Sequence, residues 1–196
     1  ITQAALDERL LRDPAALNGM RRVVMIQCVG SRDEVHPYCS RVCCAQAARN
    51  ALGLKRLDPT LEVWILYREM RTAGMHELAY REARQAGVLF ARYELPERPA
   101  VERAAAGPLR VSFTDPIIRR RLEIEADLLV LSTGLEPTRP AVDLESLGAA
   151  VDSDGFLIPE HAKMRPVNLG QPGLYVCGSA LGPCFIDEAI QQGRAA

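Results

Sequence analysis

Long apolar runs, aromatic residues and an excess of charge of one sign are all lacking from this sequence of 196 residues. Aromatic residues make up 5%, too few for a surface on which nucleic-acid bases stack. The 24 basic and 25 acidic residues leave a net charge of −1, which disfavours a nucleic acid or an anionic membrane surface as partner. Uncharged apolar runs such as residues 23–26 are far shorter than the ~20 residues that cross a bilayer. We therefore expect neither a membrane span nor a nucleic-acid partner.

Signals at the two ends of the chain are also missing. The first residues lack the charged-then-apolar pattern of a secretion signal, and the chain begins at Ile1 without methionine. The last residues, 191–196, form a good helical stretch without a cap. We interpret the chain as a piece of a longer protein, and we expect a cytoplasmic location.

Runs rich in β-branched residues alternate with helical stretches, and a hydrophobic share of 48% suits a packed core. The predicted strands are 22–30, 61–67 and 88–91, and the predicted helices are 40–52 and 75–85, with Ser40 as N-cap and Gly53 as stop. Strands and helices in this order predict a right-handed βαβαβ unit around a parallel sheet.

The remaining segments predict further elements. They are a helix over 1–20 broken near Pro14 and Gly19, an antiparallel ribbon of 110–113 and 121–124, buried strands at 127–134 and 173–178, and a last helix from Ile186. The fold class predicted is therefore α/β.

Four of the six cysteines fall within seventeen residues, at Cys28, Cys39, Cys43 and Cys44. A secreted disulfide scaffold is usually shorter and denser in cysteine, so a redox or metal role is favoured. Cys39 and Cys43 are four residues apart, and on a helix that starts near Ser40 they would point the same way. Cys28 would arrive from the carboxyl end of the preceding strand. Four thiolates converging at a strand end and a helix N-terminus suit an iron–sulfur cluster.

Two other interpretations of these cysteines stay open. They could be buried structural thiols, since cysteine is among the most buried residue types. They could also bind zinc, although zinc sites usually space their ligands in pairs, and the adjacent Cys43 and Cys44 fit one ion poorly. The distant Cys177 and Cys184 match no ligand spacing, and we interpret them as small apolar fillers.

The glycine-rich turn of pyridine-nucleotide domains is absent. That turn has the pattern G-x-G-x-x-G, which lets the backbone approach a pyrophosphate, and the sequence contains it nowhere. The first strand ends instead with Gln27, Cys28, Val29 and Gly30. Basic residues over 68–71, after the second strand, keep NAD(P)H binding open, with a solvated sheet edge as the alternative.

Three stretches together resemble the flavoproteins with two dinucleotide-binding domains, the group that contains thioredoxin reductase. Residues 131–137 read Leu-Ser-Thr-Gly-Leu-Glu-Pro, and residues 173–178 read Gly-Leu-Tyr-Val-Cys-Gly. The third stretch is the βαβαβ unit that precedes both. A sharper resemblance, carried by residues 24–32, 38–44 and 66–74, is to the A subunit of heterodisulfide reductase and its relatives.

This resemblance implies a fold, a set of cofactors and a function. It implies an N-terminal helical segment over 1–20, an NAD(P)-binding-like domain over 21–125 and the C-terminal part of an FAD-binding domain over 126–196. FAD would lie against Gly134, Gly178, Gly182 and Pro183, and a 4Fe–4S cluster would be held by Cys28, Cys39, Cys43 and Cys44. No residue would be catalytic in its own right.

The function implied is electron relay between FAD and 4Fe–4S clusters, in an oxidoreductase complex with other redox subunits. The alternatives are an NAD(P)H-dependent flavin or disulfide reductase domain and a zinc-stabilised interaction module. Because the first flavin-binding half with its own glycine-rich turn is missing, we expect this chain alone to bind FAD weakly or not at all.

Overall fold

The structure is a computed structural model that describes residues 1–196 except 96, 104–106, 139–143, 145 and 147. The described residues form two compact units, residues 1–29 with 43–133 and residues 30–42 with 134–196. These units group the chain differently from the three predicted segments 1–20, 21–125 and 126–196, whose assignment to nucleotide-binding domains stays a prediction. Among the described residues, no helix has both the length and the apolar character needed to cross a membrane.

A four-stranded parallel sheet is the centre of the first unit. Its strands lie in the order β3-β2-β1-β7, and their bounds are β1 Arg22–Val29, β2 Glu62–Tyr67, β3 Leu89–Arg92 and β7 Leu128–Thr133. The five consecutive residues 23–27 of β1 are all buried, which is the pattern of a strand covered on both faces. The α/β, Rossmann-like fold class is confirmed.

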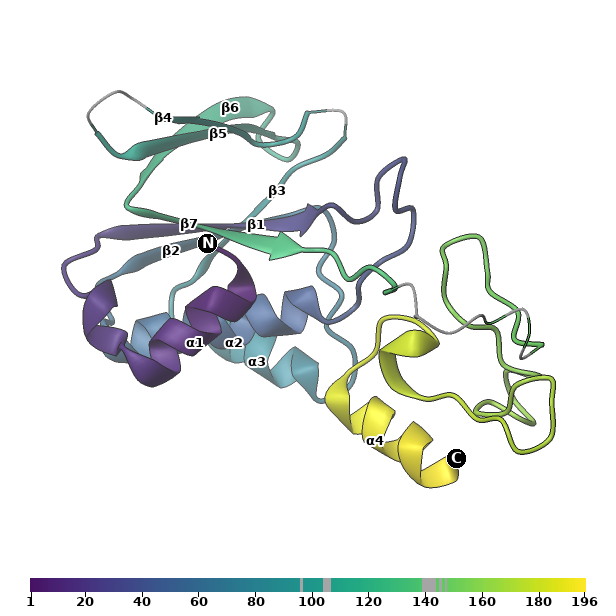
Figure 1. The fold of residues 1–196 in the computed structure, drawn as a ribbon. Helices are drawn as coiled ribbons and strands as arrows, with labels where there is room; N and C mark the ends of the chain where they lie inside the picture. Colours follow the sequence, from purple (N-terminus) through teal and green to yellow (C-terminus); the bar gives the residue numbers. More distant parts are fainter. Residues whose placement is uncertain (96, 104–106, 139–143, 145, 147) are drawn as a thin grey trace. The chain divides into compact units, whose positions relative to one another are not determined.

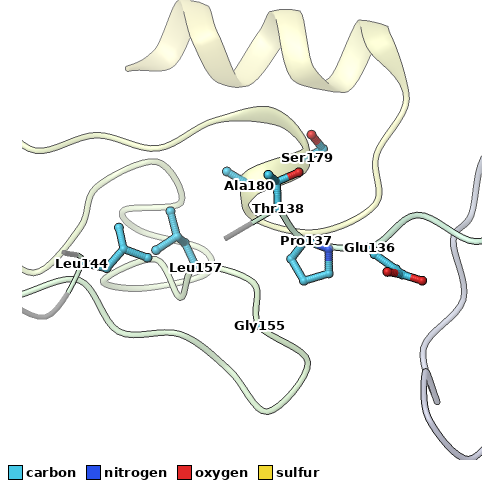
Figure 2. Close-up of a pocket in the computed structure, with 8 residues that line it drawn as sticks. All are labelled: Glu136, Pro137, Thr138, Leu144, Gly155, Leu157, Ser179 and Ala180. Atoms are coloured by element: carbon cyan, nitrogen blue, oxygen red, sulfur yellow. The ribbon is translucent and has the colours of Figure 1, made fainter. Parts of the chain in front are cut away.

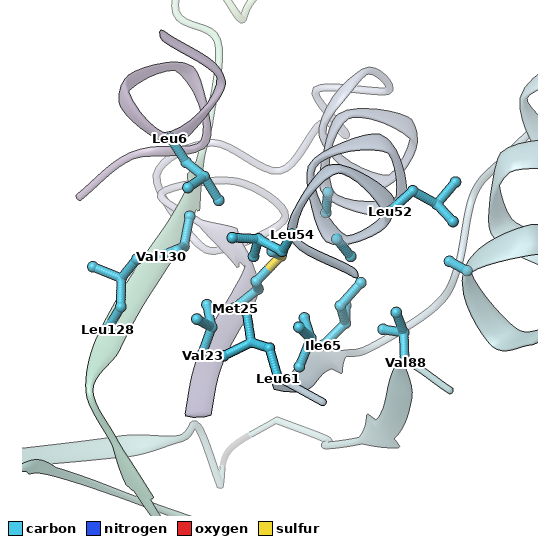
Figure 3. Close-up of a cluster of buried hydrophobic side chains, with 14 of the residues drawn as sticks. Leu6, Val23, Met25, Leu52, Leu54, Leu61, Ile65, Val88, Leu128 and Val130 are labelled. Carbon is cyan, nitrogen blue, oxygen red and sulfur yellow. The ribbon is translucent and has the colours of Figure 1, made fainter. Parts of the chain in front are cut away.

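Three helices cover one face of this sheet (Figure 1). They are α1 Gln3–Arg12, α2 Cys43–Leu57 and α3 His76–Gln85, and the predicted break after α1 is the short helix η1 Pro14–Leu17. Val23 and Met25 of β1 share a buried cluster with Leu6 of α1 and Leu54 of α2 (Figure 3). Burial of these side chains holds the helical layer to the sheet.

An antiparallel sheet covers the other face (Figure 1). Its strands are β4 Ala100–Arg103, β5 Leu109–Asp115 and β6 Arg120–Ala126, in that order. Val24 and Ile26 of β1 pack in one cluster with Val111 and Phe113 of β5. The predicted ribbon is thus confirmed. Strand β4 was not predicted from the sequence, because all four of its residues are exposed and the strand therefore lacks the alternation of apolar and polar residues that marks a half-buried strand.

The predicted helix over 40–52 is wrong at both ends, because α2 runs from Cys43 to Leu57. Ser40 does not cap it, and the Ser40 side chain is instead hydrogen-bonded within the second unit. Gly53 does not stop it, since a β-carbon there would lie 3.1 Å from Cδ1 of Leu10. The small residue lets α1 and α2 approach closely, and this packing outweighs the low helix propensity of glycine.

The second unit contains little regular structure, with η2 Gly178–Ala180 and α4 Ile186–Ala195 as its helices among the described residues. The predicted strand over 173–178 is wrong. Tyr175 forms a single antiparallel bridge with Asn168, and the amide of Val176 donates to the carbonyl of Val167 at 2.8 Å. A strand needs a neighbouring backbone along its length, and here the segment just before it supplies only this short pairing.

The N-terminal helix offers a matched test of the helical core. Leu6 is fully buried, whereas Leu11 on the same helix is 78% exposed. We expect Leu6→Ala to lower the free energy of unfolding by about 2–5 kcal/mol, because the substitution leaves a cavity in the core. Leu11→Ala should change it by less than about 0.5 kcal/mol. Denaturant titrations of both variants check this, and equal effects would contradict the packing described.

Candidate functional site

Three of the predicted ligand cysteines lie in the first unit, at the carboxyl edge of the parallel sheet. Cys28 is near the end of β1 and has a φ of 60°, which is rare for a residue other than glycine. Cys43 and Cys44 are the first two residues of α2, and both are buried. Since a helix that follows a parallel strand returns antiparallel to it, its N-terminus lies at this same edge. The fold therefore places all three thiols at the same edge of the parallel sheet.

The edge has the electrostatic character of an anion site. The first backbone N–H groups of a helix cannot form hydrogen bonds within it, and the dipole of α2 places partial positive charge there. The thiol of Cys44 donates to the carbonyl oxygen of Glu69, just after β2, at 3.8 Å. Cys44 therefore joins the start of α2 to the segment just after β2.

Gln27, the residue before Cys28, is an exception to the rule that buried polar groups are paired. Its side chain is fully buried, and neither Nε2 nor Oε1 has a hydrogen-bond partner among the described residues. Its backbone carbonyl is satisfied, because the hydroxyl of Tyr93 donates to it at 2.6 Å. A buried amide without partners is rare, and such groups often mark the place of a ligand or an ordered water.

Cys39, the fourth predicted ligand, belongs to the second unit. It precedes α2, so the argument that placed Cys39 and Cys43 four residues apart on one helix is wrong. The backbone N–H of Arg41 donates to the Cys39 sulfur at 3.4 Å. Within the part of the chain that the structure describes, no group of three or more His, Cys, Asp or Glu residues is placed to hold a metal ion. The four-cysteine ligand set therefore stays a prediction.

Hydrogen bonds tie the loop that carries Cys39 to the turn after β7, both in the second unit. The hydroxyl of Ser40 donates to Oγ of Ser31 at 3.3 Å and accepts from the amide of Leu135 at 2.9 Å. The hydroxyl of Tyr38 donates to the carbonyl oxygen of Leu135 at 2.9 Å. Because Ser40 is completely buried, these bonds replace its contacts with water and fix the loop.

Gly134 lies in that turn, where two backbones come close. A β-carbon at Gly134 would be 2.3 Å from the carbonyl oxygen of Gly30, a distance that no side chain tolerates. The glycine predicted to contact FAD thus has a structural reason to be glycine. Its contact with FAD stays a prediction.

The other predicted flavin residues precede α4. Gly178 and Gly182 have positive φ angles of 68° and 143°. The amide of Gly178 donates to Oε1 of Gln192 at 2.7 Å, and the carbonyl of Pro183 accepts from Nη1 of Arg41 at 3.1 Å. These contacts hold the turn in place before α4 begins.

Arg41 fastens this turn, and sequence reasoning missed that role. Its Nη2 lies 2.7 Å from Oε1 of Glu188, and its guanidinium carbon lies 6.0 Å from the centre of the Phe185 ring. Glu188 in turn accepts from the amide of Phe185 at 2.8 Å, which satisfies an N–H group that the helical hydrogen bonds of α4 leave out. Side-chain pairs this far apart in the sequence leave no local pattern.

A pocket of about 240 Å³ is lined in part by Ser179 and Ala180 of η2 (Figure 2). Its lining residues come from four separated stretches of the chain and are Glu136, Pro137, Thr138, Leu144, Gly155, Leu157, Ser179 and Ala180. Sequence reasoning missed this pocket, since only folding brings the segments together.

Cys177 and Cys184 both lie in the second unit, and their sulfurs are free thiols. Burial, and then the nearby carboxylate of Glu188, raise the pKa of the Cys184 thiol, against the opposing effect of Arg41. Cys184 is therefore protonated at neutral pH and is a poor nucleophile.

No family model matches the chain. Two curated relatives are 42% identical to it over about 90% of its length. They are the A subunit of the H(2)/formate:CoB-CoM heterodisulfide,ferredoxin reductase of Methanococcus maripaludis, matched over 183 residues, and the iron–sulfur A subunit of the CoB–CoM heterodisulfide reductase of Methanocaldococcus jannaschii, matched over 182 residues. The predicted resemblance to the A subunit of heterodisulfide reductase is confirmed.

The chain matches only part of these A subunits. The chain spans 27% of the length of each of these two relatives. Among solved structures, thioredoxin reductase of Lactococcus lactis is similar with a TM-score of 0.58 and 18% identity, over 89% of this chain and 50% of that one. This likeness concerns the fold and agrees with the predicted thioredoxin-reductase-like architecture.

Gly134 provides a test of the turn after β7. We expect Gly134→Ala to destabilise the second unit by more than about 2 kcal/mol, because the added methyl group collides with backbone at Gly30. Gly170→Ala is the matched control, since the nearest atom would lie 3.5 Å away, at ordinary contact distance. Hydrogen exchange of residues 134–196 and thermal melts measure both. Equal, small effects would show that the close approach is absent in solution.

Proposed function

We propose that this chain carries a 4Fe–4S cluster and relays electrons between it and FAD, as part of an oxidoreductase similar to heterodisulfide reductase. The observation that supports this most is the replacement of a nucleotide-binding turn by cysteines at the carboxyl edge of a Rossmann-like sheet. The curated relatives are reductase subunits, and one of them is named an iron–sulfur subunit.

Three of the proposed ligands, Cys28, Cys43 and Cys44, lie at this edge, and their thiols suit such a cluster. In this proposal Cys28, Cys39, Cys43 and Cys44 supply the four thiolates that these clusters require. Cys43 and Cys44 are 5% and 3% exposed, so they would shield the iron from water. The N-terminus of α2 would offset the negative charge of the thiolates. When bound, the cluster accepts and releases one electron at a time.

The second unit would contribute to the FAD site. The glycines at 178 and 182 leave backbone uncovered by side chains, so a phosphate or ribityl chain could approach closely. Gly134 would contribute through the turn that it forms, because the carbonyl of Gly30 fills the space where its side chain would be. The amide of Gly178 already donates to Gln192, so its part would be this close approach rather than a hydrogen bond. Pro183 and Arg41 would hold the turn in place.

Because the chain spans about a quarter of its relatives, the complete reaction and the partners are also part of the proposal. We propose that other redox subunits of a heterodisulfide-reductase-like complex donate and accept the electrons. The protein's own contribution would be spacing, ligation and electrostatics.

NAD(P)H binding by the first unit has weaker support. Arg68 and Arg71, after β2, are the residues that would contact a 2′-phosphate, but Nε and Nη2 of Arg71 lie 3.0 and 2.8 Å from Oε2 of Glu69. A carboxylate at this position repels a phosphate. NADPH should therefore not bleach flavin bound by this protein, and rapid bleaching would favour the nucleotide-dependent reductase instead.

Iron and sulfide counts test the cluster. Protein purified without oxygen should contain about four irons and four sulfides per chain and give an EPR signal after reduction. Cys43→Ser should lose most of the iron, because it removes a ligand from the buried start of α2. Cys177→Ser, which removes an exposed cysteine outside the proposed ligand set, should retain it. Stoichiometric zinc without sulfide would support the zinc-stabilised module, and full iron in Cys43→Ser would exclude Cys43 as a ligand.

A further inference from the structure

The side-chain amide of Gln27 is buried in the first unit without a hydrogen-bond partner among the described residues, and nothing in the fold of this unit explains it. The side chain is 0% exposed, and both of its polar atoms lack hydrogen-bond partners among the described residues. Such a group destabilises a folded protein unless something pairs with it. A leucine of similar size would pack there without this cost.

A comparison within the same core shows that the fold can pair a buried glutamine. Gln3 is 3% exposed, and its Nε2 donates to Oγ of Ser132 at 3.2 Å. Its Oε1 accepts from Nδ2 of Asn50 at 2.8 Å. Gln27 has nothing equivalent among the residues that the structure describes, so a partner outside these protein atoms is indicated.

The register of β1 places the Gln27 side chain on the side of α2. Successive side chains of a strand alternate between its faces, and Val23 and Met25 pack into the cluster on the helical side. Gln27 continues this row toward the carboxyl edge. The register of β1 against β7 shifts between Ile26 and Val29, and both of these residues pack against the cluster of the antiparallel sheet, which leaves Gln27 to the helical side. At that edge α2 begins with Cys43 and Cys44, and β1 leads directly into Cys28.

The backbone around Gln27 is held independently of its side chain. The Gln27 carbonyl accepts from the hydroxyl of Tyr93 at 2.6 Å, and the next residue turns into the left-handed region. The amide group thus extends from a fixed strand end at the sheet edge where α2 begins, and its Nε2 can donate to an anionic ligand held there.

We propose that Nε2 of Gln27 donates a hydrogen bond to a sulfur of the 4Fe–4S cluster and thereby raises its reduction potential. This inference rests on the proposed function. Reduction adds negative charge to the sulfurs, so an N–H donor stabilises the reduced cluster more than the oxidised one. Gln27 would be a positioning and tuning residue rather than a ligand.

Gln27→Leu tests this assignment, because it removes the donor and keeps the volume. With the cluster bound, the midpoint potential should shift to a more negative value, as followed by EPR-monitored redox titration. Pulsed EPR should lose a coupling to an exchangeable proton that wild type shows. With the cluster removed, the variant should melt at a higher temperature than wild type, since the unpaired amide is gone. Gln27→Met, equally long and without a donor, should behave alike and substitutes if Gln27→Leu does not fold.

Gln3→Leu is the matched control. It removes a paired amide from the same core, so it should lower the melting temperature with and without the cluster. Its midpoint potential should equal that of wild type. A potential shift of the same size in Gln3→Leu would mean that the effect of Gln27 is one of general packing, and would overturn the inference.

The iron count separates failure of this inference from failure of the proposed function. Wild type without iron or sulfide would refute the cluster itself. Wild type with about four irons, but with an unchanged potential and proton coupling in both Gln27 variants, would refute the hydrogen bond alone. In that case ordered water would be the partner of the amide.

Discussion

Burial of β1 on both faces is the constraint on which the rest of the first unit depends. Val23 and Met25 pack against the helices, while Val24 and Ile26 pack against the antiparallel sheet. With both of its faces covered, β1 is hydrogen-bonded along one edge to β2 and along the other edge to β7. The carboxyl end of β1 is thus fixed between two strands and the start of α2, where the chain places Gln27 and Cys28 before leaving the sheet.

This edge is where nucleotide-binding relatives of the fold place a glycine-rich turn. Here the turn is replaced by thiols and by an amide that no described residue pairs with, while the helix N-terminus that favours anions is kept. Under the proposed function, one architecture serves two kinds of anionic group. The chemistry of the donors decides between them, since thiolates bind iron and backbone amides bind phosphate.

The second unit is held mainly by specific polar contacts. Its buried apolar cluster is small, with Ala149, Leu169 and Val176 as its most buried members. Ser40 and Tyr38 fix the Cys39 loop to the turn at Leu135, and Arg41 fixes the turn at Pro183 through its backbone carbonyl. The glycine at 134 allows its backbone to approach that of Gly30 closely. The stability of this unit therefore depends more on a few hydrogen bonds and close backbone contacts than on buried apolar area.

The sequence by itself determined the parallel strands, the helices between them and the family resemblance, because hydrophobic periodicity and short motifs are local properties. Only the tertiary structure decided that α2 begins at Cys43, that Gly53 serves helix packing and that residues 173–178 form a bridge rather than a strand. It also revealed the orphaned amide of Gln27 and the ion pair of Arg41 with Glu188. These features depend on which distant residues meet, and no local pattern encodes such meetings.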